Sequence, residues 1–247
     1  MNLAATLPDG AVVDGWLTDD QAAMLAAAAA ACPPGGAIVE IGSFHGRSTI
    51  VLARAAPPGA TVVAIDPHAG NDRGPRQIDG FVDEAADDRQ VFERNLVAAG
   101  IRHRVRHVSR FSRDAHSAVT GQLDVLYIDG AHRYRPARTD IRDWGDRVVD
   151  GGAMLIHDSF SSVGVTAAIV RELMFGRRFR YVGRSRSLTL YRADLRHRGR
   201  RARAMSSLRQ TAQLPWFVGN LSLKMLLSAG IGKLIARTGR TAPEWPY

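Results

Sequence analysis

The sequence predicts an α/β protein built on a doubly wound, mostly parallel sheet. Apolar runs of strand length recur along the 247 residues, and segments with helical period lie between them. Most of these runs end in polar or charged residues. Strands that alternate with helices form parallel sheets, because each helix carries the chain back to the same end of the sheet. The polar strand ends are therefore expected to gather along one edge.

Five runs are expected to form parallel strands, and two more a closing hairpin. The parallel strands are predicted at residues 37–41, 60–65, 104–108, 123–128 and 152–156. The runs at 179–182 and 187–191 flank a short polar turn and predict an antiparallel hairpin. Helices are expected at residues 19–32, 83–99, 112–120, 137–149 and 163–174, and from Ser48 onward.

The turn after the first strand is the most informative segment. Gly42 and Gly46 flank it, and a helix opens at Ser48. Glycines let the backbone approach a ligand, and the first N–H groups of a helix attract an anionic group. The spacing G-x-x-x-G differs from the G-x-G-x-x-G of dinucleotide-binding proteins, which disfavours an NAD(P) oxidoreductase. A buried strand followed by an ordinary turn is the alternative interpretation.

Chemically capable side chains follow the other strands. Asp66 ends the second strand about 20 residues after the glycine turn, where the acid of a βαβ unit accepts hydrogen bonds from ribose hydroxyls. The fourth strand ends in Asp129-Gly130-Ala131-His132, and the fifth ends in His157-Asp158. Ligands of open α/β sheets bind beyond the carboxyl ends of the strands. These groups are therefore expected to share one site.

On these residues, the segment 36–193 resembles a class I S-adenosylmethionine-dependent methyltransferase. It is most similar to the metal-assisted O-methyltransferases, such as the macrolide sugar and catechol enzymes. The resemblance rests on Glu40-Ile41-Gly42-x-x-x-Gly46, Asp66, Asp129-Gly130-Ala131-His132-x-Tyr134, Asp140, Gly151-Gly152 and His157-Asp158. It implies a Rossmann-like fold, S-adenosylmethionine as cofactor, a divalent cation (Mg²⁺ or Mn²⁺), and a hydroxyl acceptor on a saccharide or another small metabolite.

Strand-end position and the resemblance together assign the cofactor site. The expected cofactor-binding residues are Glu40, Gly42, Ser43, Gly46, Ser48, Asp66, Ser109 and Asp129. Two of these have plainer alternatives, since Asp66 could only cap a turn and Ser48 could only cap a helix.

The resemblance also implies the catalytic and metal-binding residues. His132 is expected to be the general base, because an imidazole titrates near working pH. Asp129, His157 and Asp158 are expected to bind the cation. His157 departs from the resembled enzymes, which usually carry a carboxylate or amide there, and it makes Mn²⁺ as suitable as Mg²⁺. The alternatives are a helix-capping role for His132, and metal-free orientation of the substrate by the two aspartates.

Charge divides the chain into an acidic body and a basic end. Residues 1–175 hold 17 Lys+Arg and 22 Asp+Glu, a net charge of −5. Residues 176–247 hold 16 Lys+Arg and 2 Asp+Glu, a net charge of +14, and the two parts together give the +9 of the whole chain.

Three parts of the chain are expected: a loosely held N-terminal leader and covering helix at 1–35, a methyltransferase domain at 36–195, and a basic amphipathic helical appendage at 196–247. The Gly-, Pro- and Asp-rich segment 67–82 is expected to form a mobile lid over the cofactor or the acceptor, with a solvated insertion as the alternative.

The appendage is expected to be separable from the catalytic site, and its partner stays open. Its apolar residues predict packing on the body or on a second subunit, as in a homodimer, or peripheral contact with a membrane. Nucleic acid is disfavoured as a partner because Trp216 and Phe217 cluster instead of being spread over a sheet face on which bases could stack.

An RNA methyltransferase with a basic arm and a non-catalytic scaffold remain the alternative functions. With one cysteine, no signal segment and no run of about 18 apolar residues, the expected location is the cytoplasm, with or without contact to the inner membrane face.

Overall fold

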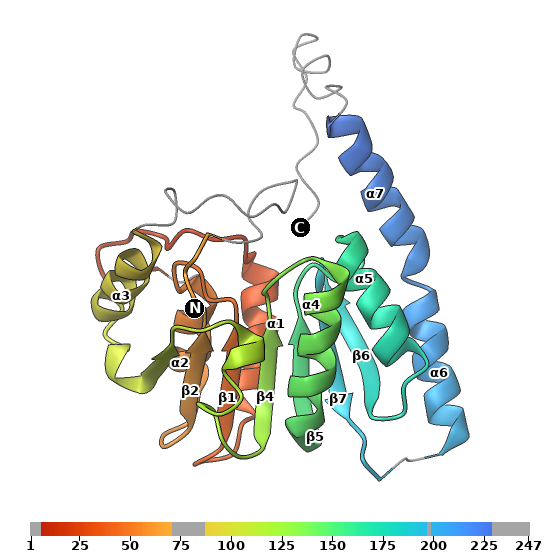
Figure 1. The fold of residues 1–247 in the computed structure, drawn as a ribbon, viewed down its shortest axis with the longest axis horizontal. Coiled ribbons are helices and arrows are strands. Elements are labelled where there is room, and N and C mark those ends of the chain that lie inside the picture. Colours follow the sequence, from red (N-terminus) through yellow and green to blue (C-terminus); the bar gives the residue numbers. More distant parts are fainter. Residues whose placement is uncertain (1–5, 71–86, 197–198, 229–247) are drawn as a thin grey trace.

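The computed structural model describes residues 6–70, 87–196 and 199–228, which form a three-layer α/β fold (Figure 1). Its seven-stranded sheet has the order β3-β2-β1-β4-β5-β7-β6. The parallel strands are β1 (Ala37–Ile41), β2 (Thr61–Ile65), β3 (Val105–Val108), β4 (Leu123–Ile128) and β5 (Val148–Ile156). The hairpin strands are β6 (Phe179–Ser185) and β7 (Leu188–Ala193), and β7 runs antiparallel to both of its neighbours. The predicted doubly wound sheet with its closing hairpin is confirmed.

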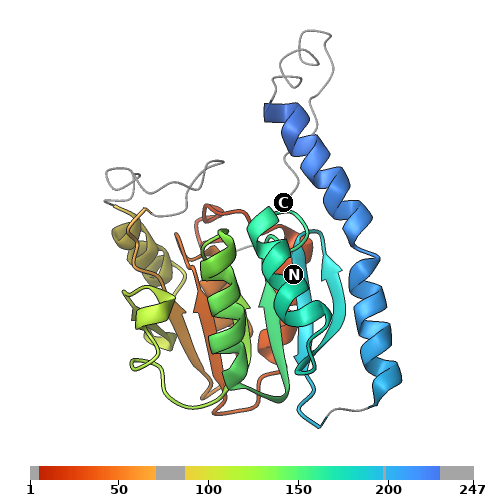
Figure 2. The ribbon, with the colours of Figure 1, turned by 45° about the vertical axis from the view of Figure 1, so that its right-hand side comes forward.

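Helices cover both faces of the sheet (Figures 1 and 2). One face packs against α1 (Asp19–Ala30), α2 (Arg47–Ala55) and α3 (Asp88–Ala98), and the other against α4 (Tyr134–Thr139) and α5 (Val163–Ile169). Successive side chains of a strand point to opposite faces. Ile38 accordingly packs in the core that contains Leu25 of α1, whereas Val39 packs in the core that contains Ile169 of α5. The central strands are buried on both faces, as their continuous apolar runs predict.

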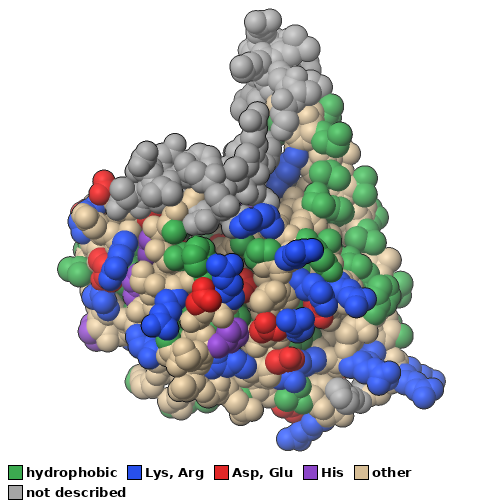
Figure 3. All heavy atoms as spheres, in the orientation of Figure 1, with side chains coloured by type: hydrophobic (Ala, Val, Ile, Leu, Met, Phe, Trp, Pro, Cys, Tyr) green, Lys and Arg blue, Asp and Glu red, His purple; other side chains and the backbone are tan. Residues whose placement is uncertain are grey.

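Two helices follow the hairpin and lie along the β6 edge. They are α6 (Arg200–Thr211) and α7 (Leu214–Ser228), so a helical appendage is present, as predicted. The Tyr181 N–H of β6 donates to Ser206 Oγ of α6 at 2.9 Å, which satisfies a backbone group on the edge strand. In Figure 3, hydrophobic side chains line the α7 side of the molecule. Within the described part of the chain, no helix combines the length and the hydropathy needed to cross a membrane.

The stretch before α1 packs more tightly than expected. Val13 and Leu17 are buried in the core, and the Arg47 guanidinium of α2 donates to the carbonyls of Val13 (3.4 Å) and Gly15 (3.0 Å). A loosely held leader is therefore the wrong description for residues 13–17. Sequence patterns do not predict this packing, because it depends on one long-range arginine and two isolated apolar side chains. The boundaries of the three predicted parts stay predictions.

Other departures concern the limits of elements. The helix predicted at 112–120 is only a 3₁₀ turn at Ser112–Asp114. The helix predicted at 137–149 begins earlier, at Tyr134, because a proline such as Pro136 is tolerated in the first turn of a helix. It continues from α4 into a π-helical turn at Asp140–Trp144. Most of the predicted lid, and residues 229–247 of the predicted appendage, lie outside the described residues.

Candidate functional site

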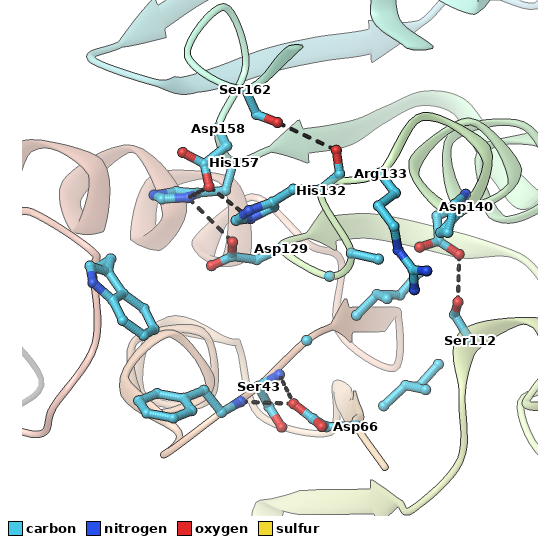
Figure 4. Close-up of a pocket in the computed structure, with 18 of the residues that line it drawn as sticks. Ser43, Asp66, Ser112, Asp129, His132, Arg133, Asp140, His157, Asp158 and Ser162 are labelled. Carbon is cyan, nitrogen blue, oxygen red and sulfur yellow. Dashed lines mark hydrogen bonds and ion pairs between the residues drawn. The ribbon is translucent and has the colours of Figure 1, made fainter. Parts of the chain in front are cut away.

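A cavity of about 1120 Å³ lies beyond the carboxyl ends of β1, β2, β4 and β5 (Figure 4). β1 lies between β2 and β4, so the chain winds away from it in both directions. Such a switch point leaves a crevice between adjacent strand ends, where ligands of open α/β sheets bind. The walls come from the glycine turn after β1, the segments that follow β2, β4 and β5, and one side of α7.

Two glycines hold the segment after β4 in place. Gly42 has a φ of +84°, and a Cβ at this position would collide with the carbonyl of Asp129. On the other side, a Cβ on Gly164 of α5 would collide with the carbonyl of His132. Backbone from three elements therefore meets around residues 129–132. This close approach fixes where Asp129 and His132 face the cavity.

Asp66 ties the glycine turn to the end of β2. Its Oδ2 accepts hydrogen bonds from the N–H groups of Ser43 (2.8 Å) and Phe44 (2.9 Å), and its Oδ1 accepts from the N–H of His68 (2.8 Å). Asp66 therefore caps the glycine turn, as the alternative interpretation of this residue predicted. Asp66, Gly42 and Ser43 also line the cavity. Since a carboxylate offers about four acceptor positions, capping leaves room for ribose hydroxyls.

Glu40 lies beneath the turn, fully buried and away from the cavity lining. The hydroxyls of Ser48 and Thr49 donate to its two oxygens, Thr49 at 2.5 Å. Burial raises the pKa of Glu40 to about 8, although both hydroxyl hydrogen bonds act to lower it. Glu40 therefore supports the start of α2 from below. Ser48 lines the cavity, but its hydroxyl is directed to Glu40, and Thr49 is a partner that sequence reasoning missed.

Two other predicted cofactor residues do not line the cavity. Gly46 caps α2 with a φ of +90° and lies against Phe92. Ser109 is exposed beside β3. Ser112, three residues later, does line the cavity, and its hydroxyl donates to Asp140 Oδ1 at 2.5 Å. Burial raises the pKa of Asp140 to about 7. Asp140 sits in the π-helical turn after α4, a local irregularity that is frequent at functional sites.

The remaining predicted residues form one cluster at the ends of β4 and β5, on the wall opposite Ser43 and Asp66 (Figure 4). His132 Nε2 lies 2.8 Å from Asp158 Oδ2, and His157 Nδ1 lies 3.2 Å from Asp129 Oδ1. The Tyr127 hydroxyl donates to Asp129 Oδ2 at 2.8 Å. The structure thus joins the predicted base to a predicted metal-binding carboxylate.

Burial and charge oppose each other in this cluster. Burial alone would lower the pKa of His132, but the hydrogen bond and charge of Asp158 outweigh it and raise that pKa above its usual value. Burial would likewise raise the pKa of Asp158, but His157 and His132 hold it well below the usual range. The two carboxylates therefore need positive charge beside them, either as protonated imidazole or as a bound cation.

The donor set fits a divalent cation. Asp129, His132 and Asp158 each offer a ligand atom, and these atoms lie within 4.8 Å of one another. Carboxylate oxygens and imidazole nitrogen suit Mn²⁺, and carboxylates suit Mg²⁺. His157 lies outside this set, although its Nδ1 is 3.5 Å from Asp158 Oδ2. As a metal ligand, His157 stays a prediction.

α7 contributes to this wall, which the sequence did not predict. Leu221 and Lys224 line the cavity. Lys224 Nζ donates to the carbonyl of Ser161 at 3.0 Å, and the buried Asn220 Nδ2 donates to the carbonyl of Phe160 at 3.1 Å. In the same turn, the hydroxyl of Ser161 donates to Asp158 Oδ1 at 3.0 Å. α7 therefore holds the turn that carries Asp158, and the expected separation of the appendage from the site is not what the geometry supports.

The turn held by α7 is conformationally demanding. Asp158 and Phe160 have φ values of 53° and 56°, in the left-handed region that non-glycine residues rarely adopt. Such a conformation persists only where the surroundings fix it. The one sequence signal was Lys224, the only charged residue in the apolar stretch Leu214–Ser228.

Comparison with known proteins shows which family the central segment is similar to and which fold the chain shares. A family model described as a methyltransferase domain matches residues 39–159. The O-methyltransferase NovP has a similar structure, with a TM-score of 0.53 and 19% identity over 73% of this chain and 83% of that chain. A candidate O-methyltransferase from Klebsiella pneumoniae gives a TM-score of 0.53 and 18% identity over 77% and 84%. A protein from Corynebacterium glutamicum has a TM-score of 0.54 and 15% sequence identity over 75% of this chain and 85% of that chain. At these identities the likeness shows the fold.

The buried Glu40 carboxyl predicts a pH-dependent stability. Its pKa of about 8 in the folded protein lies above the ordinary 4.5, so folding favours the protonated form. The contribution is complete below pH 4.5 and is lost as the pH rises through 8. Glu40→Gln keeps the shape without the ionisation. As the pH rises across this range, the unfolding free energy of Glu40→Gln should therefore increase relative to that of the unmutated protein, by at most about 1.4 kcal/mol per pH unit. Urea denaturation of both proteins at several pH values measures this difference, and a difference that stays constant with pH would contradict the prediction.

The hydrogen bond from Asn220 of α7 to the carbonyl of Phe160 predicts that Asn220→Leu will loosen the turn after β5. The variant leaves the Phe160 carbonyl without its side-chain donor, which should cost about 1–3 kcal/mol of unfolding free energy. Hydrogen exchange in the peptide that contains residues 158–162 should become faster. Ser222→Ala is the matched control, because the Ser222 hydroxyl donates to Val218 within the same helix. Equal exchange in both variants would show that α7 does not hold this turn.

Proposed function

We propose that this chain is a class I S-adenosylmethionine-dependent methyltransferase and that it transfers the methyl group of this cofactor to a hydroxyl oxygen of a small molecule; the methyltransferase-domain match over residues 39–159 and the shared fold support this. A saccharide is the proposed acceptor class, since the strand-end motif resembles that of sugar O-methyltransferases. The observation that carries the proposal is the pair of His132 and Asp158, 2.8 Å apart, on the cavity wall opposite Ser43 and Asp66. The wall that suits the cofactor thus faces a histidine base.

The glycine turn and Asp66 are proposed to hold the cofactor. Asp66 would accept hydrogen bonds from the ribose hydroxyls while it continues to cap the turn. Gly42 and Ser43 would lie along the methionine part, where the absence of a Cβ at Gly42 permits close approach. Glu40, Ser48 and Gly46 would act from beneath, by fixing the turn and the start of α2.

His132 is proposed to remove the acceptor proton. As the oxygen–methyl bond forms and the methyl–sulfur bond breaks, the hydroxyl proton passes to the imidazole. Asp158 then stabilises the imidazolium through its short contact with Nε2. The same contact raises the pKa of His132, so the imidazole binds the proton firmly but accepts it only above that pKa. Much of the remaining rate would come from holding the acceptor oxygen in line.

Asp129 and Asp158 are proposed to hold Mg²⁺ or Mn²⁺, with His157 or His132 as a third ligand. A cation here would orient the acceptor hydroxyl and lower its pKa. A nitrogen that binds a metal cannot also accept a proton. His132 is therefore either the base or the third ligand, and the measurements below separate the two roles.

Two other functions stay as alternatives. RNA methylation would use the basic arm, but the arginines of α6 belong to the helix that packs on the β6 edge, and α6 supplies no residue to the cavity lining. A scaffold without activity is disfavoured by the cluster of Asp129, His132 and Asp158. Homodimerisation and a cytoplasmic location with membrane contact remain proposals too.

The cofactor proposal predicts binding in the low micromolar range, roughly −7 to −8 kcal/mol, by calorimetry with S-adenosylmethionine. Asp66→Ala should weaken binding by about 1–3 kcal/mol through the loss of charge-assisted hydrogen bonds. Ser109→Ala is the control, because Ser109 does not line the cavity. An unmutated protein that binds neither the cofactor nor its demethylated product would overturn the assignment.

The transfer reaction itself is testable with methyl-labelled S-adenosylmethionine and a panel of saccharides, with the methyl position located by NMR. His132→Ala should lower turnover by roughly 10²–10⁴-fold with little change in cofactor affinity. The exposed His103→Ala is the matched control. Label found on nitrogen or carbon, or on RNA alone, would contradict O-methyl transfer to a small molecule.

The same assay decides the role of the metal. Chelation should abolish transfer, and Mn²⁺ or Mg²⁺ should restore it in the unmutated protein but not in Asp129→Ala or Asp158→Ala. Calorimetric titration of His132→Ala with Mn²⁺ then separates the two roles of His132. If His132 is the base, the variant should bind Mn²⁺ with nearly unchanged affinity; if His132 is a ligand, the affinity should fall. Full activity in excess chelator would leave both aspartates as metal-free orienting groups.

A further inference from the structure

The outer side of α6 and α7 carries a stripe of exposed apolar side chains. Its members, named here the C-terminal stripe, are Met205 (51% exposed), Leu208 (63%), Val218 (58%), Met225 (65%) and Leu226 (48%). Within each helix their spacing follows the helical period, so Met205 and Leu208 share one side of α6, and Val218, Met225 and Leu226 share one side of α7. Figure 3 shows hydrophobic side chains gathered along this edge of the molecule. An exposed row of this kind marks an interaction surface.

The inner sides of the same helices are already in use. Ser206 and Gln210 of α6 are buried against β6 and the π-helical turn Val170–Met174 that continues α5. Ser206 Oγ accepts from the Tyr181 N–H, and Gln210 Nε2 donates to the carbonyl of Leu173. Asn220 of α7 is buried against the turn after β5. The stripe is therefore the outward side of helices whose other side is fixed to the body. Figure 2 shows α7 continuing past the sheet, so part of this surface projects from the body.

The charges around the stripe favour one class of partner. Residues 199–228 contain Arg200, Arg201, Arg203, Arg209 and Lys224 but no aspartate or glutamate. Arg200, Arg201 and Arg209 are exposed beside the apolar residues on α6. If two copies paired through this segment, it would offer the arginines no carboxylate. An anionic lipid surface offers a phosphate to each of them together with an apolar layer for the stripe.

We propose that the C-terminal stripe docks this enzyme on an anionic membrane surface, with the apolar side chains in the interfacial layer and the α6 arginines at lipid phosphates. The anionic surface attracts the arginines, and burial of the apolar side chains in the interfacial layer adds to this attraction. Leu221 and Lys224 of the same α7 line the cavity, so docking would place the cavity beside the lipid. The proposal does not depend on the identity of the methyl acceptor.

The test is cosedimentation of the full chain with vesicles of phosphatidylcholine alone and of phosphatidylcholine with phosphatidylglycerol. Binding is expected only with the anionic vesicles. Added salt should weaken it without abolishing it, because apolar burial persists when charges are screened. The pair Leu208→Gln and Met225→Gln should lower the partition coefficient by about tenfold or more. Arg200→Gln with Arg201→Gln and Arg209→Gln should remove most of the salt dependence.

Matched controls come from α3, which is remote from the stripe. Val97 is 64% exposed there, so Val97→Gln tests whether any exposed apolar residue has the same effect. Arg89→Gln with Arg94→Gln tests loss of charge in general. The proposal is overturned if the unmutated protein does not bind anionic vesicles, or if the α3 variants lose binding equally. It is also overturned if the chain is a dimer in solution that the stripe variants convert to a monomer, since the stripe then meets a second copy.

Discussion

The whole site depends on how closely the backbone packs around the segment after β4. Gly42 of the turn after β1 lies against the carbonyl of Asp129, and Gly164 of α5 lies against the carbonyl of His132. Neither place has room for a Cβ, so residues 129–132 are held between two other elements. This constraint brings the end of β4 within reach of both the β1 turn and the β5 turn. One cavity can therefore combine the wall of Ser43 and Asp66, proposed to hold the cofactor, with the wall of His132 and Asp158, proposed to act in catalysis.

The second consequence of that packing is electrostatic. Asp129 and Asp158 are drawn together in a partly dehydrated place, where two carboxylates repel each other unless positive charge is supplied. His132 and His157 lie beside the two carboxylates, and the pKa of each imidazole is raised despite burial, which favours its positively charged form. A divalent cation would replace those protons, because metal binding requires deprotonated ligands. The cluster is thus suited either to hold protons or to hold a metal.

Much of the fold and part of the site followed from local sequence signals. Apolar runs of strand length, glycines at a turn and acids at strand ends are short-range patterns, and they gave the sheet and the positions of Asp66, Asp129 and Asp158. What the sequence did not reveal depends on distant partners. Thr49 meets Glu40 only after β1 and α2 fold together, and Asn220 meets Phe160 across 60 residues. Neither contact leaves a periodic or compositional trace.

The appendage shows why such contacts change the functional argument. Composition sets residues 196–247 apart, because their basic and apolar character differs from that of the body. The structure joins the described residues 199–228 to the body, since α7 holds the turn that presents Asp158, where φ is left-handed, and adds Lys224 to the cavity. A helix with its inner side in the cavity wall and its outer side exposed and apolar connects two surfaces through one element. Anything that binds the outer side of α7 therefore acts on an element that also holds the turn carrying the Asp158 carboxylate.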